Sequence, residues 1–451
     1  MNNLGLILLC LNLAGIFFCI IMLKRFQNLI QKSPLLQVTG FNSFSIVVKL
    51  ISSLVVSKVT AVFLGTQGIT FIGNLRNALS VLQNFSTGGL NKAVVKYSSE
   101  HKERPEYYTV FISTLFWVFI ILSILIFLGV YVFSEILANY VFGNQDYTYI
   151  FRWLAVLLPL YGLNTFLIAI LQGLEQFKRV IKINIFIHIL NLLVFGFSVY
   201  QFGLSGALMA VIAVPSISLL ISLSLAGKYL KVGCYFNYRV FSKQQLKYFG
   251  QYAFMTLISA VSFPLVYLGI RQHILESISI DDAGYWEATF RLSNFYLIFI
   301  QSLLSLYILP KFAQAKSKAE FRAIVLDFYK QIIPLFGVGL FILFLLRKYL
   351  VLVVFSEEFL PVTSILGWQM VADFFRVLAL VMVYQFHAKK MLWHYIITDI
   401  ILAVGLYFSA VIGVKYLALS GVVIGHVIIY LVYFLLILFI FRKSIFKLKV
   451  T

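Results

Sequence analysis

Polar and charged side chains recur along one face of several long apolar stretches of this chain. At 100° per residue, four side chains of the stretch 68 to 95 fall within about 60° of one another on a helix, and they are Arg76, Ser80, Gln83 and Thr87. Two later stretches repeat the pattern with Glu287, Arg291, Asn294, Gln301 and Ser305, and with Gln369, Asp373, Arg376 and His387. Such stripes need a partner other than lipid, and we expect them to face a water-filled central cavity.

Bases outnumber acids inside these apolar stretches. The bases are Lys49, Lys58, Arg76, Lys92, Arg271, Arg291 and Arg376, and the acids are Glu287, Asp373 and Asp399. Because charged groups are costly within a membrane span, each is a candidate functional residue. Seven bases and three acids leave the interior with a net charge of about +4, which favours an anionic ligand.

Structural roles compete with binding roles for several of these residues. Glu287 and Arg291 are four residues apart on a helix, and Asp373 and Arg376 are three apart. Both spacings are those of ion pairs that hold helices together. Lys58 lies near a span end, from which its ammonium group can reach the membrane surface. These alternatives stay open at the level of sequence.

The sequence carries no recognisable motif for catalysis or metal binding. It has no G-x-x-x-x-G-K-[ST] phosphate loop, and its cysteines, Cys10, Cys19 and Cys234, lack the spacing of metal ligands. Histidines within the spans are single, and we expect His426 to pack or to make a local hydrogen bond. We therefore predict no catalytic residue, no metal site and no cofactor, and an enzyme is not expected.

The composition indicates that lipid surrounds most of the chain. Of 451 residues, 61% are hydrophobic and 12% are charged, whereas about a quarter are charged in soluble domains. One apolar span lies near 4 to 23, and twelve more centre on 41 to 64, 68 to 95, 108 to 134, 151 to 172, 181 to 200, 203 to 226, 248 to 271, 283 to 309, 331 to 355, 361 to 386, 391 to 413 and 416 to 441. Since barrel strands would alternate instead, the predicted fold class is an all-α polytopic membrane protein.

The basic residues orient these spans. The chain has 36 Lys and Arg against 16 Asp and Glu, a formal net charge of +20. About 25 bases fall in the connections on one side and about 3 on the other, which assigns the first side to the cytoplasm. Because the bases are spread over many connections and form no single patch, we do not expect nucleic acid as a partner.

The twelve body spans divide into two sets of six at a basic connection. Gly68 and Gly284 each open the second helix of their set, and the helix ends also look alike. An even number of helices per set predicts a parallel repeat, in which two six-helix lobes surround a central cationic cavity. The predicted parts are an extra N-terminal transmembrane helix with a cytoplasmic linker (1–40), an N-lobe (41–228), a cytoplasmic inter-lobe loop (229–247), and a C-lobe with a basic tail (248–451).

Five segments together resemble one family of membrane transporters. They are VVKLISSLVVSKVTAVFLGTQGITFIGNLRNAL (47 to 79), GGLNKAVVKY (88 to 97), FGNQDY (142 to 147), LYILP (306 to 310) and LGWQMVADFFRV (366 to 377). The chain resembles the lipid III flippases of enterobacterial common antigen and the O-antigen translocases. These form the Wzx-type branch of the multidrug/oligosaccharidyl-lipid/polysaccharide exporter superfamily. The resemblance does not include the opening span.

The resemblance implies a function, a subcellular location and binding partners. Such proteins move an undecaprenyl-pyrophosphate-linked oligosaccharide from the cytoplasmic to the periplasmic leaflet of the bacterial inner membrane by alternating access. Implied partners are this lipid-linked glycan, membrane lipid, and the polymerase and chain-length proteins of the same pathway. The residues expected in the cationic cavity are Lys49, Lys58, Arg76, Arg271, Arg291 and Arg376, with Gln83, Asn294 and Gln369 as a polar stripe and Glu287, Asp373 and Asp399 for ion coupling.

Three other functions compete with this hypothesis: a drug or cation exporter, an enzyme of the same pathway, and a membrane scaffold. A drug or cation exporter of the same superfamily would need acids within the membrane, and the first six body helices contain none. A polymerase or ligase of the same pathway would need a sizeable periplasmic loop, which the span pattern lacks. A membrane scaffold would not need the polar stripes.

Overall fold

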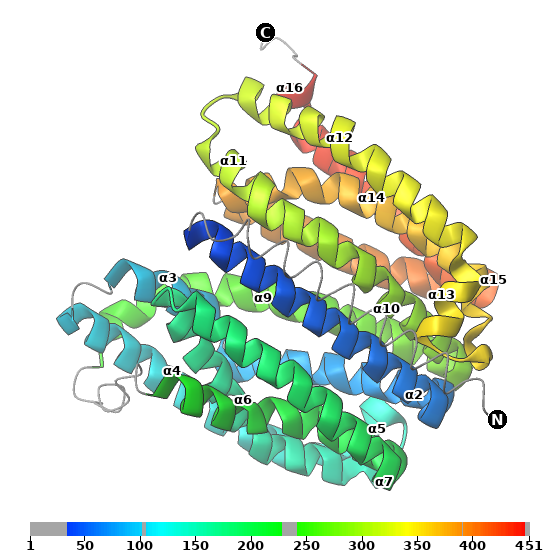
Figure 1. The fold of residues 1–451 in the computed structure, drawn as a ribbon, viewed down its shortest axis with the longest axis horizontal. Helices are drawn as coiled ribbons and strands as arrows, with labels where there is room; N and C mark the ends of the chain where they lie inside the picture. The colour runs from blue at the N-terminus through cyan, green and yellow to red at the C-terminus, as the bar shows by residue number, and fades with distance from the viewer. Residues whose placement is uncertain (1–33, 102–104, 228–240, 390, 447–451) are drawn as a thin grey trace.

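Every regular element of the described chain is a helix. The computed structural model describes residues 34–101, 105–227, 241–389 and 391–446. The first half contains α2 (Pro34–Thr87), α3 (Asn91–His101), α4 (Pro105–Val132), α5 (Ser134–Phe142), η1 (Gln145–Tyr147), α6 (Thr148–Gly173) and α7 (Phe177–Ala226). The second half contains α9 (Lys243–Ser277), α10 (Ile280–Leu303), η4 (Leu304–Ile308), α11 (Leu309–Gln314), α12 (Lys318–Leu345), α13 (Arg347–Val354), η5 (Glu357–Phe359), α14 (Val362–Ala388), α15 (Leu392–Ile440) and α16 (Arg442–Ile445). The predicted all-helical membrane fold is confirmed (Figure 1).

Three of these helices are too long to cross a bilayer once. α2, α7 and α15 have 54, 50 and 49 residues. Helices of that length measure about 75 to 80 Å, whereas the hydrocarbon core is about 30 Å thick. Each is interrupted by a residue with positive φ, namely Gly65 at 59°, Gly203 at 56° and Ala418 at 46°. Each long helix is therefore a pair of spans joined at this break.

Glycine allows the two spans of α15 to fold back on each other closely. A Cβ atom on Gly413 would lie 2.2 Å from the carbonyl oxygen of Gly421. One on Gly425 would lie 2.8 Å from the carbonyl oxygen of Ser409. Both pairs bracket the break at Ala418, so the two spans run antiparallel, and a larger side chain at these glycines would push them apart.

The described helices account for the twelve predicted body spans. Seven helices of the described residues are long and apolar enough to cross a membrane. Three of the seven contain a break and supply two spans each, which makes ten. α9 and α10, with 35 and 24 residues, are not among the seven, but they are long enough to cross a bilayer and lie at the two remaining predicted spans. The expected opening span at 4 to 23 lies outside the described residues.

Helix bounds differ from the predicted ones at several places. The predicted span 331 to 355 is divided between α12, which ends at Leu345, and α13, which begins at Arg347, and the predicted span 68 to 95 is divided between α2, which ends at Thr87, and α3, which begins at Asn91.

Helices also extend beyond the predicted spans at two places. α2 begins at Pro34, so residues 34–40, expected in a linker, are helical. α9 begins at Lys243, so the end of the expected loop 229–247 is helical as well. Hydropathy detects the part of a helix that lies in lipid, whereas polar turns continue the same helix into the membrane interface. The rest of that loop lies outside the described residues.

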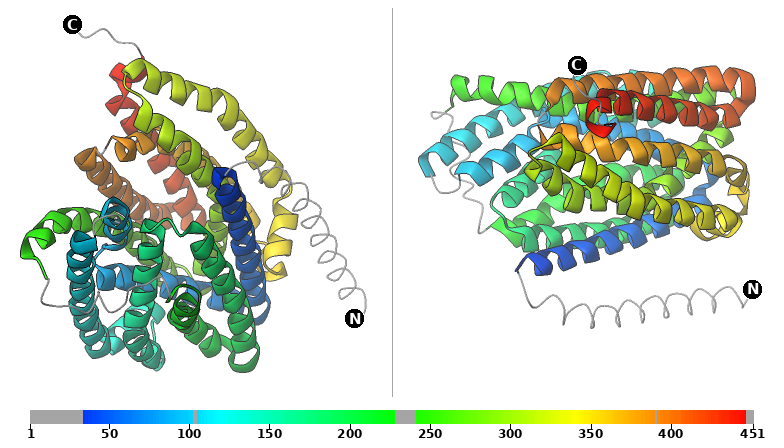
Figure 2. Two further views of the ribbon diagram at one scale, coloured as in Figure 1. Left: turned by 60° about the vertical axis from the view of Figure 1, so that its left-hand side comes forward. Right: turned by 90° about the horizontal axis from the view of Figure 1, so that it is seen from above.

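The buried hydrophobic residues mostly follow the two halves of the chain. One core cluster draws on residues 267–445, and another lies within residues 90–226. A further cluster joins the halves, since Ala61 of α2 packs with Phe355 after α13. Figures 1 and 2 show α4, α6 and α7 (cyan to green) and α12, α14 and α15 (yellow to red) as two neighbouring groups. The division into two lobes about a cavity stays a prediction.

The two ends of the helical bundle differ in charge. In Figure 1, α3 and α11 lie toward one end, and α5 and α13 lie toward the other. Lys96 and Lys311 belong to the first end, whereas Glu135 and Glu357 belong to the second. The excess of bases assigns the first end to the cytoplasm, and the second is called the outer end below.

Candidate functional site

α2 contacts the second half of the chain at the outer end. The ammonium group of Lys58 donates hydrogen bonds to the carbonyl oxygens of Leu352, at 2.7 Å, and Phe355. The hydroxyl of Thr66, one residue after the break in α2, donates to a carboxylate oxygen of Asp281 on α10. Lys58, expected in the cationic cavity, therefore binds backbone oxygens of the opposite half.

Two glycines bring α2 and α10 into direct contact. A Cβ atom on Gly284 would lie 2.7 Å from the carbonyl oxygen of Thr66. One on Gly73 would lie 2.7 Å from the carboxyl carbon of Glu287. Because any larger side chain would separate the two helices here, both glycines have a packing role at this contact.

α2, α9 and α10 together position a group that we call the arginine cluster, which consists of Arg76, Arg271, Glu287 and Arg291. Glu287 accepts hydrogen bonds from Nη2 of Arg271 and, at 2.9 Å, from Nε of Arg291. Nη1 of Arg271 donates to Oδ1 of Asn74 at 2.8 Å, which links α9 to α2. Arg271, Glu287 and Arg291 are only 1%, 6% and 7% exposed.

The positive charge of the arginine cluster exceeds its negative charge. Glu287 is hydrogen-bonded to Arg271 and Arg291, and Arg76 lies within electrostatic range of Glu287 and Arg291. The cluster therefore has three guanidinium groups and one carboxylate. Among the described residues, the buried Nη1 and Nη2 atoms of Arg291 have no hydrogen-bond partner. An unpaired buried donor costs about 1 to 3 kcal/mol, and a charged one costs more. The cluster is therefore suited to accept an anion.

Exposed polar side chains lie beside the arginine cluster. Arg76 is exposed although its charged neighbours are buried. Asn294 and Gln301 of α10 are exposed too, and at 100° per residue they lie within about 80° of Arg291 on the helix. Polar groups exposed within a membrane span face water in preference to lipid. These positions indicate a water-accessible surface next to the arginine cluster.

A second group of polar side chains surrounds Asp373 on α14, and we call it the aspartate cluster. It consists of Asp373, Ser293, Tyr296, Gln369 and Arg376. Oδ2 of Asp373 accepts hydrogen bonds from the hydroxyls of Ser293 and Tyr296 at 2.6 and 2.5 Å. Oδ1 accepts from Gln369 at 3.2 Å and lies 3.8 Å from Nη1 of Arg376. Both carboxylate oxygens thus have partners, and the one acid balances the one base.

Asp399 of α15 lies outside the contacts of both clusters. It is 5% exposed, and in the described part of the chain its Oδ2 atom has no hydrogen-bond partner. Lys92 of α3 is within electrostatic range and is itself exposed. Of the three acids expected in ion coupling, Glu287 and Asp373 have both oxygens hydrogen-bonded, whereas Asp399 has a buried oxygen without a partner.

The remaining expected site residues contact other parts of the protein. Lys49 is exposed and lies within electrostatic range of His188 on α7. Gln83 is buried and donates to the hydroxyl of Thr165 at 3.3 Å. The structure therefore gathers Arg76, Arg271, Arg291 and Glu287 from the expected set, and it places Gln369, Asp373 and Arg376 in the separate aspartate cluster. Their roles in binding stay predictions.

Sequence reasoning did not select several residues that complete these clusters. Asn74 lies on the opposite face of its helix from Arg76, and Ser293 and Tyr296 lie off the polar stripe of α10. Their partners are distant in sequence, so helical spacing gives no signal for them. His426 does make the hydrogen bond expected of it, since its Nδ1 atom lies 3.2 Å from Oε1 of Gln369.

Residues 35–316 match the sequence profile of the polysaccharide biosynthesis protein family. This chain belongs to that family. The matched region includes all four residues of the arginine cluster. Asp373 and Arg376 lie beyond it. The resemblance expected from the sequence is thereby confirmed.

One relative and two solved structures extend this comparison. The chain is 24% identical to the lipid III flippase of Escherichia coli (strain K12) over 356 residues, which cover 79% of this chain and 86% of the flippase. It is similar to an inward-facing multidrug resistance MATE family transporter of the MOP superfamily, with a TM-score of 0.76, 15% identity, and coverage of 89% and 95% of the two chains. The lipid II flippase MurJ in an inward closed conformation gives a TM-score of 0.69 at 14% identity, with coverage of 91% and 90%. The two structures establish a shared fold.

Proposed function

We propose that this protein is a flippase that moves an undecaprenyl-pyrophosphate-linked oligosaccharide, a lipid III or O-antigen unit, across the inner membrane. The unbalanced positive charge of the arginine cluster carries this proposal, because Glu287 is the one acid among three guanidinium groups. Phosphate oxygens bind guanidinium groups strongly and in pairs. Membership of the polysaccharide biosynthesis family and similarity to a lipid III flippase support the same class of cargo.

Each part of such a lipid has a matching surface. The pyrophosphate accepts hydrogen bonds from Arg76 and from the free Nη groups of Arg291. The sugars exchange hydrogen bonds with the exposed amides of Asn294 and Gln301. The polyprenyl chain, which has no polar groups, stays in the lipid beside the helices.

The contacts at the outer end support transport by alternating access. Lys58 and Thr66 hold α2 against the second half there, on the side to which cargo must leave. Three such hydrogen bonds contribute about 2 to 4 kcal/mol together. That is small enough to be broken and reformed in each cycle, so the outer end opens when α2 separates from α10 and α13.

Asp399 is the residue to which we assign coupling with an ion gradient. Its unpartnered oxygen is free to bind a proton or a cation, whereas Glu287 and Asp373 are already hydrogen-bonded through both oxygens. The variant Asp399→Asn should keep the fold and lose the dependence of transport on the gradient. Transport by Asp399→Asn that still follows the gradient would remove this assignment.

A drug exporter fits the same geometry poorly. A cationic drug needs an excess of acids in its binding site, and the arginine cluster has the opposite excess. Expression of the protein in a drug-sensitive strain separates the two functions. Raised resistance without rescue of glycan export would favour the exporter.

Complementation of a flippase-null strain tests the proposal. Arg291→Gln removes the guanidinium with two free nitrogens and should abolish glycan export while the protein still inserts. Arg152→Gln is the matched control, because Arg152 also pairs with a glutamate, Glu135 at 3.2 Å, but the two side chains are 52% and 64% exposed. Full complementation by Arg291→Gln would contradict the assigned role of the arginine cluster.

A further inference from the structure

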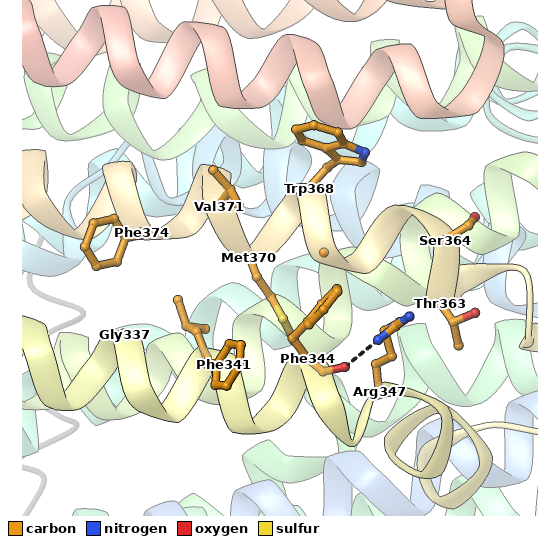
Figure 3. Close-up of a pocket in the computed structure, with 12 residues that line it drawn as sticks. Gly337, Phe341, Phe344, Arg347, Thr363, Ser364, Trp368, Met370, Val371 and Phe374 are labelled. Carbon is orange, nitrogen blue, oxygen red and sulfur yellow. Dashed lines mark hydrogen bonds between the residues drawn. The ribbon is translucent and has the colours of Figure 1, made fainter.

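A pocket of about 620 Å³ lies between α12 and α14, and none of its lining residues belongs to either charged cluster. Figure 3 shows aromatic and aliphatic side chains along most of its length, with Phe341 on α12 and Trp368, Val371 and Phe374 on α14. Phe341, Trp368 and Val371 are 62%, 48% and 42% exposed. In the part of the chain that the structure describes, no element covers these side chains, so the pocket opens toward the lipid.

One end of this pocket is polar. Arg347, Thr363 and Ser364 line it there (Figure 3). Arg347 begins α13, just after α12 ends, and the two hydroxyl residues lie in the first turn of α14. Both helices reach the outer end of the bundle at this point, so the polar end of the pocket lies at the outer membrane interface. The apolar part lies deeper in the bilayer.

The pocket has the depth of one leaflet. Ser364 and Phe374 mark its polar and apolar ends on α14. Ten residues of helix span about 15 Å, which is half of the roughly 30 Å hydrocarbon core. An occupant with a polar head at Arg347 would therefore place its chain along the outer half of the bilayer.

The charge at the polar end selects the head group. Nη1 of Arg347 donates to the carbonyl oxygen of Phe344 at 2.9 Å, and the guanidinium lies 4.2 Å from the centre of the Phe344 ring. These contacts hold the group at the pocket while its remaining N–H groups can bind phosphate. Lys348 follows and is exposed, and the pocket lining contains no acid. The first turn of α14 adds the positive end of a helix dipole.

We propose that this pocket binds one anionic phospholipid of the outer leaflet. The lipid phosphate contacts Arg347, and one acyl chain lies between Phe341 and Trp368. This site is separate from the proposed path of the glycan lipid, since none of its lining residues belongs to either cluster. It would join α12 to α14 in the second half of the protein.

Fluorescence quenching by brominated lipids tests the proposal at the pocket itself. The full-length protein is placed in lipid nanodiscs that contain either phosphatidylglycerol or phosphatidylcholine with brominated acyl chains. The signal of Trp368 is the difference between the unmodified protein and Trp368→Phe. We expect brominated phosphatidylglycerol to reach half-maximal quenching of this signal at about fivefold lower mole fraction, which is the effect of roughly one cation at a membrane surface.

A matched pair of variants assigns the preference to Arg347. Arg347→Gln should bring the two lipids to the same half-maximal mole fraction. Arg442→Gln is the control, because Arg442 also donates to a carbonyl oxygen, that of Phe439 at 3.1 Å, and lies 3.8 Å from the same residue's ring. Arg442 does not line the pocket, so its replacement should leave the fivefold preference unchanged.

Three outcomes would overturn the proposal. Equal quenching by both lipids in the unmodified protein would show an ordinary lipid contact. Loss of the preference in Arg442→Gln as well would show a general charge effect. Absence of any quenching of Trp368 would show that protein covers the pocket, either the apolar segment 4 to 23 or a second copy of the chain. Removal of residues 1–23 would then distinguish these two.

Discussion

The arginine cluster and the aspartate cluster are built from the same kinds of residue but differ in charge balance. In the first, Glu287 is shared by Arg271 and Arg291, with Arg76 close by. In the second, Asp373 accepts three hydrogen bonds from uncharged groups and has one arginine 3.8 Å away. The first cluster therefore keeps unused positive charge, and the second is neutral.

This difference separates two uses of buried charge. A neutral, fully hydrogen-bonded carboxylate ties its helices to each other, because removal of any partner leaves a buried group unsatisfied. A cluster with surplus charge is unfavourable by itself and becomes favourable when an anion enters. The aspartate cluster joins α10 and α14 within the second half, whereas the arginine cluster lies where the two halves meet.

The largest expected effect is on stability, in the aspartate cluster. Asp373→Leu leaves the Ser293 and Tyr296 hydroxyls without their acceptor and Arg376 without its opposite charge, so the free energy of unfolding should fall by about 3 to 5 kcal/mol. Denaturant unfolding in mixed micelles measures this free energy. Asp373→Asn keeps a carbonyl acceptor and should lose clearly less. Equal stability of Asp373→Leu and the unmodified protein would remove the structural role of this cluster.

Replacing a base of the arginine cluster should affect transport more than stability. Arg291→Gln takes one hydrogen bond from Glu287, but the glutamine amide can donate in its place and Arg271 stays bound, so the unfolding free energy should fall by about 1 to 3 kcal/mol, less than in Asp373→Leu. Loss of a charged hydrogen bond to cargo should lower the transport rate about ten- to hundredfold. A transport assay in proteoliposomes and the same unfolding measurement check both parts. A large loss of stability with normal transport in Arg291→Gln would show that the arginine cluster has a structural role and does not bind cargo.

The contacts of α2 with the second half at the outer end should control access to the arginine cluster. Lys58→Met removes two hydrogen bonds between the halves and should raise the population that is open at the outer end by about tenfold. In a variant without Cys10, Cys19 and Cys234, Ala61→Cys reports this opening through its rate of labelling by a membrane-impermeant maleimide, because Ala61 is 2% exposed in the cluster that joins the halves. An unchanged rate in Lys58→Met would show that these bonds do not hold the outer end closed.

The smallest effect is expected for an exposed pair of the same chemical type. Arg152 and Glu135 are 3.2 Å apart but 52% and 64% exposed. Water and salt weaken such pairs, so Arg152→Gln should change the unfolding free energy by less than about 1 kcal/mol and leave transport unchanged. A larger effect of Arg152→Gln on stability or on transport would show that an ion pair is important here even when it is exposed, so burial would not be what distinguishes the two clusters.

The sequence predicted the spans and the charged candidates because both depend on local properties. Twenty apolar residues in a row predict a span wherever they occur, and a charge such as Arg271 within one stands out against that background. Assignment of partners depends on contacts between distant segments. Asn74 meets Arg271 across 197 residues, and Ser293 meets Asp373 across 80. Helical spacing cannot reveal such pairs.

The same limit explains the different placement of Gln83 and Gln369. Both were expected on a polar stripe that faces a cavity, and both are buried, at 8% and 3% exposure. The amide of Gln83 donates to Thr165 on the neighbouring helix α6, and the amide of Gln369 donates to Asp373 on the same helix, α14. A stripe identifies side chains that need polar partners, and the fold decides whether protein or water supplies them.

Binding of the glycan lipid to the purified protein tests whether the arginine cluster holds the pyrophosphate of the cargo. The full chain in nanodiscs is titrated with an undecaprenyl-pyrophosphate-linked oligosaccharide, and inorganic pyrophosphate serves as the competitor. We expect binding that Arg291→Gln weakens by about tenfold or more and that Arg152→Gln leaves unchanged. Equal affinity in the unmodified protein and Arg291→Gln would contradict this role of the arginine cluster.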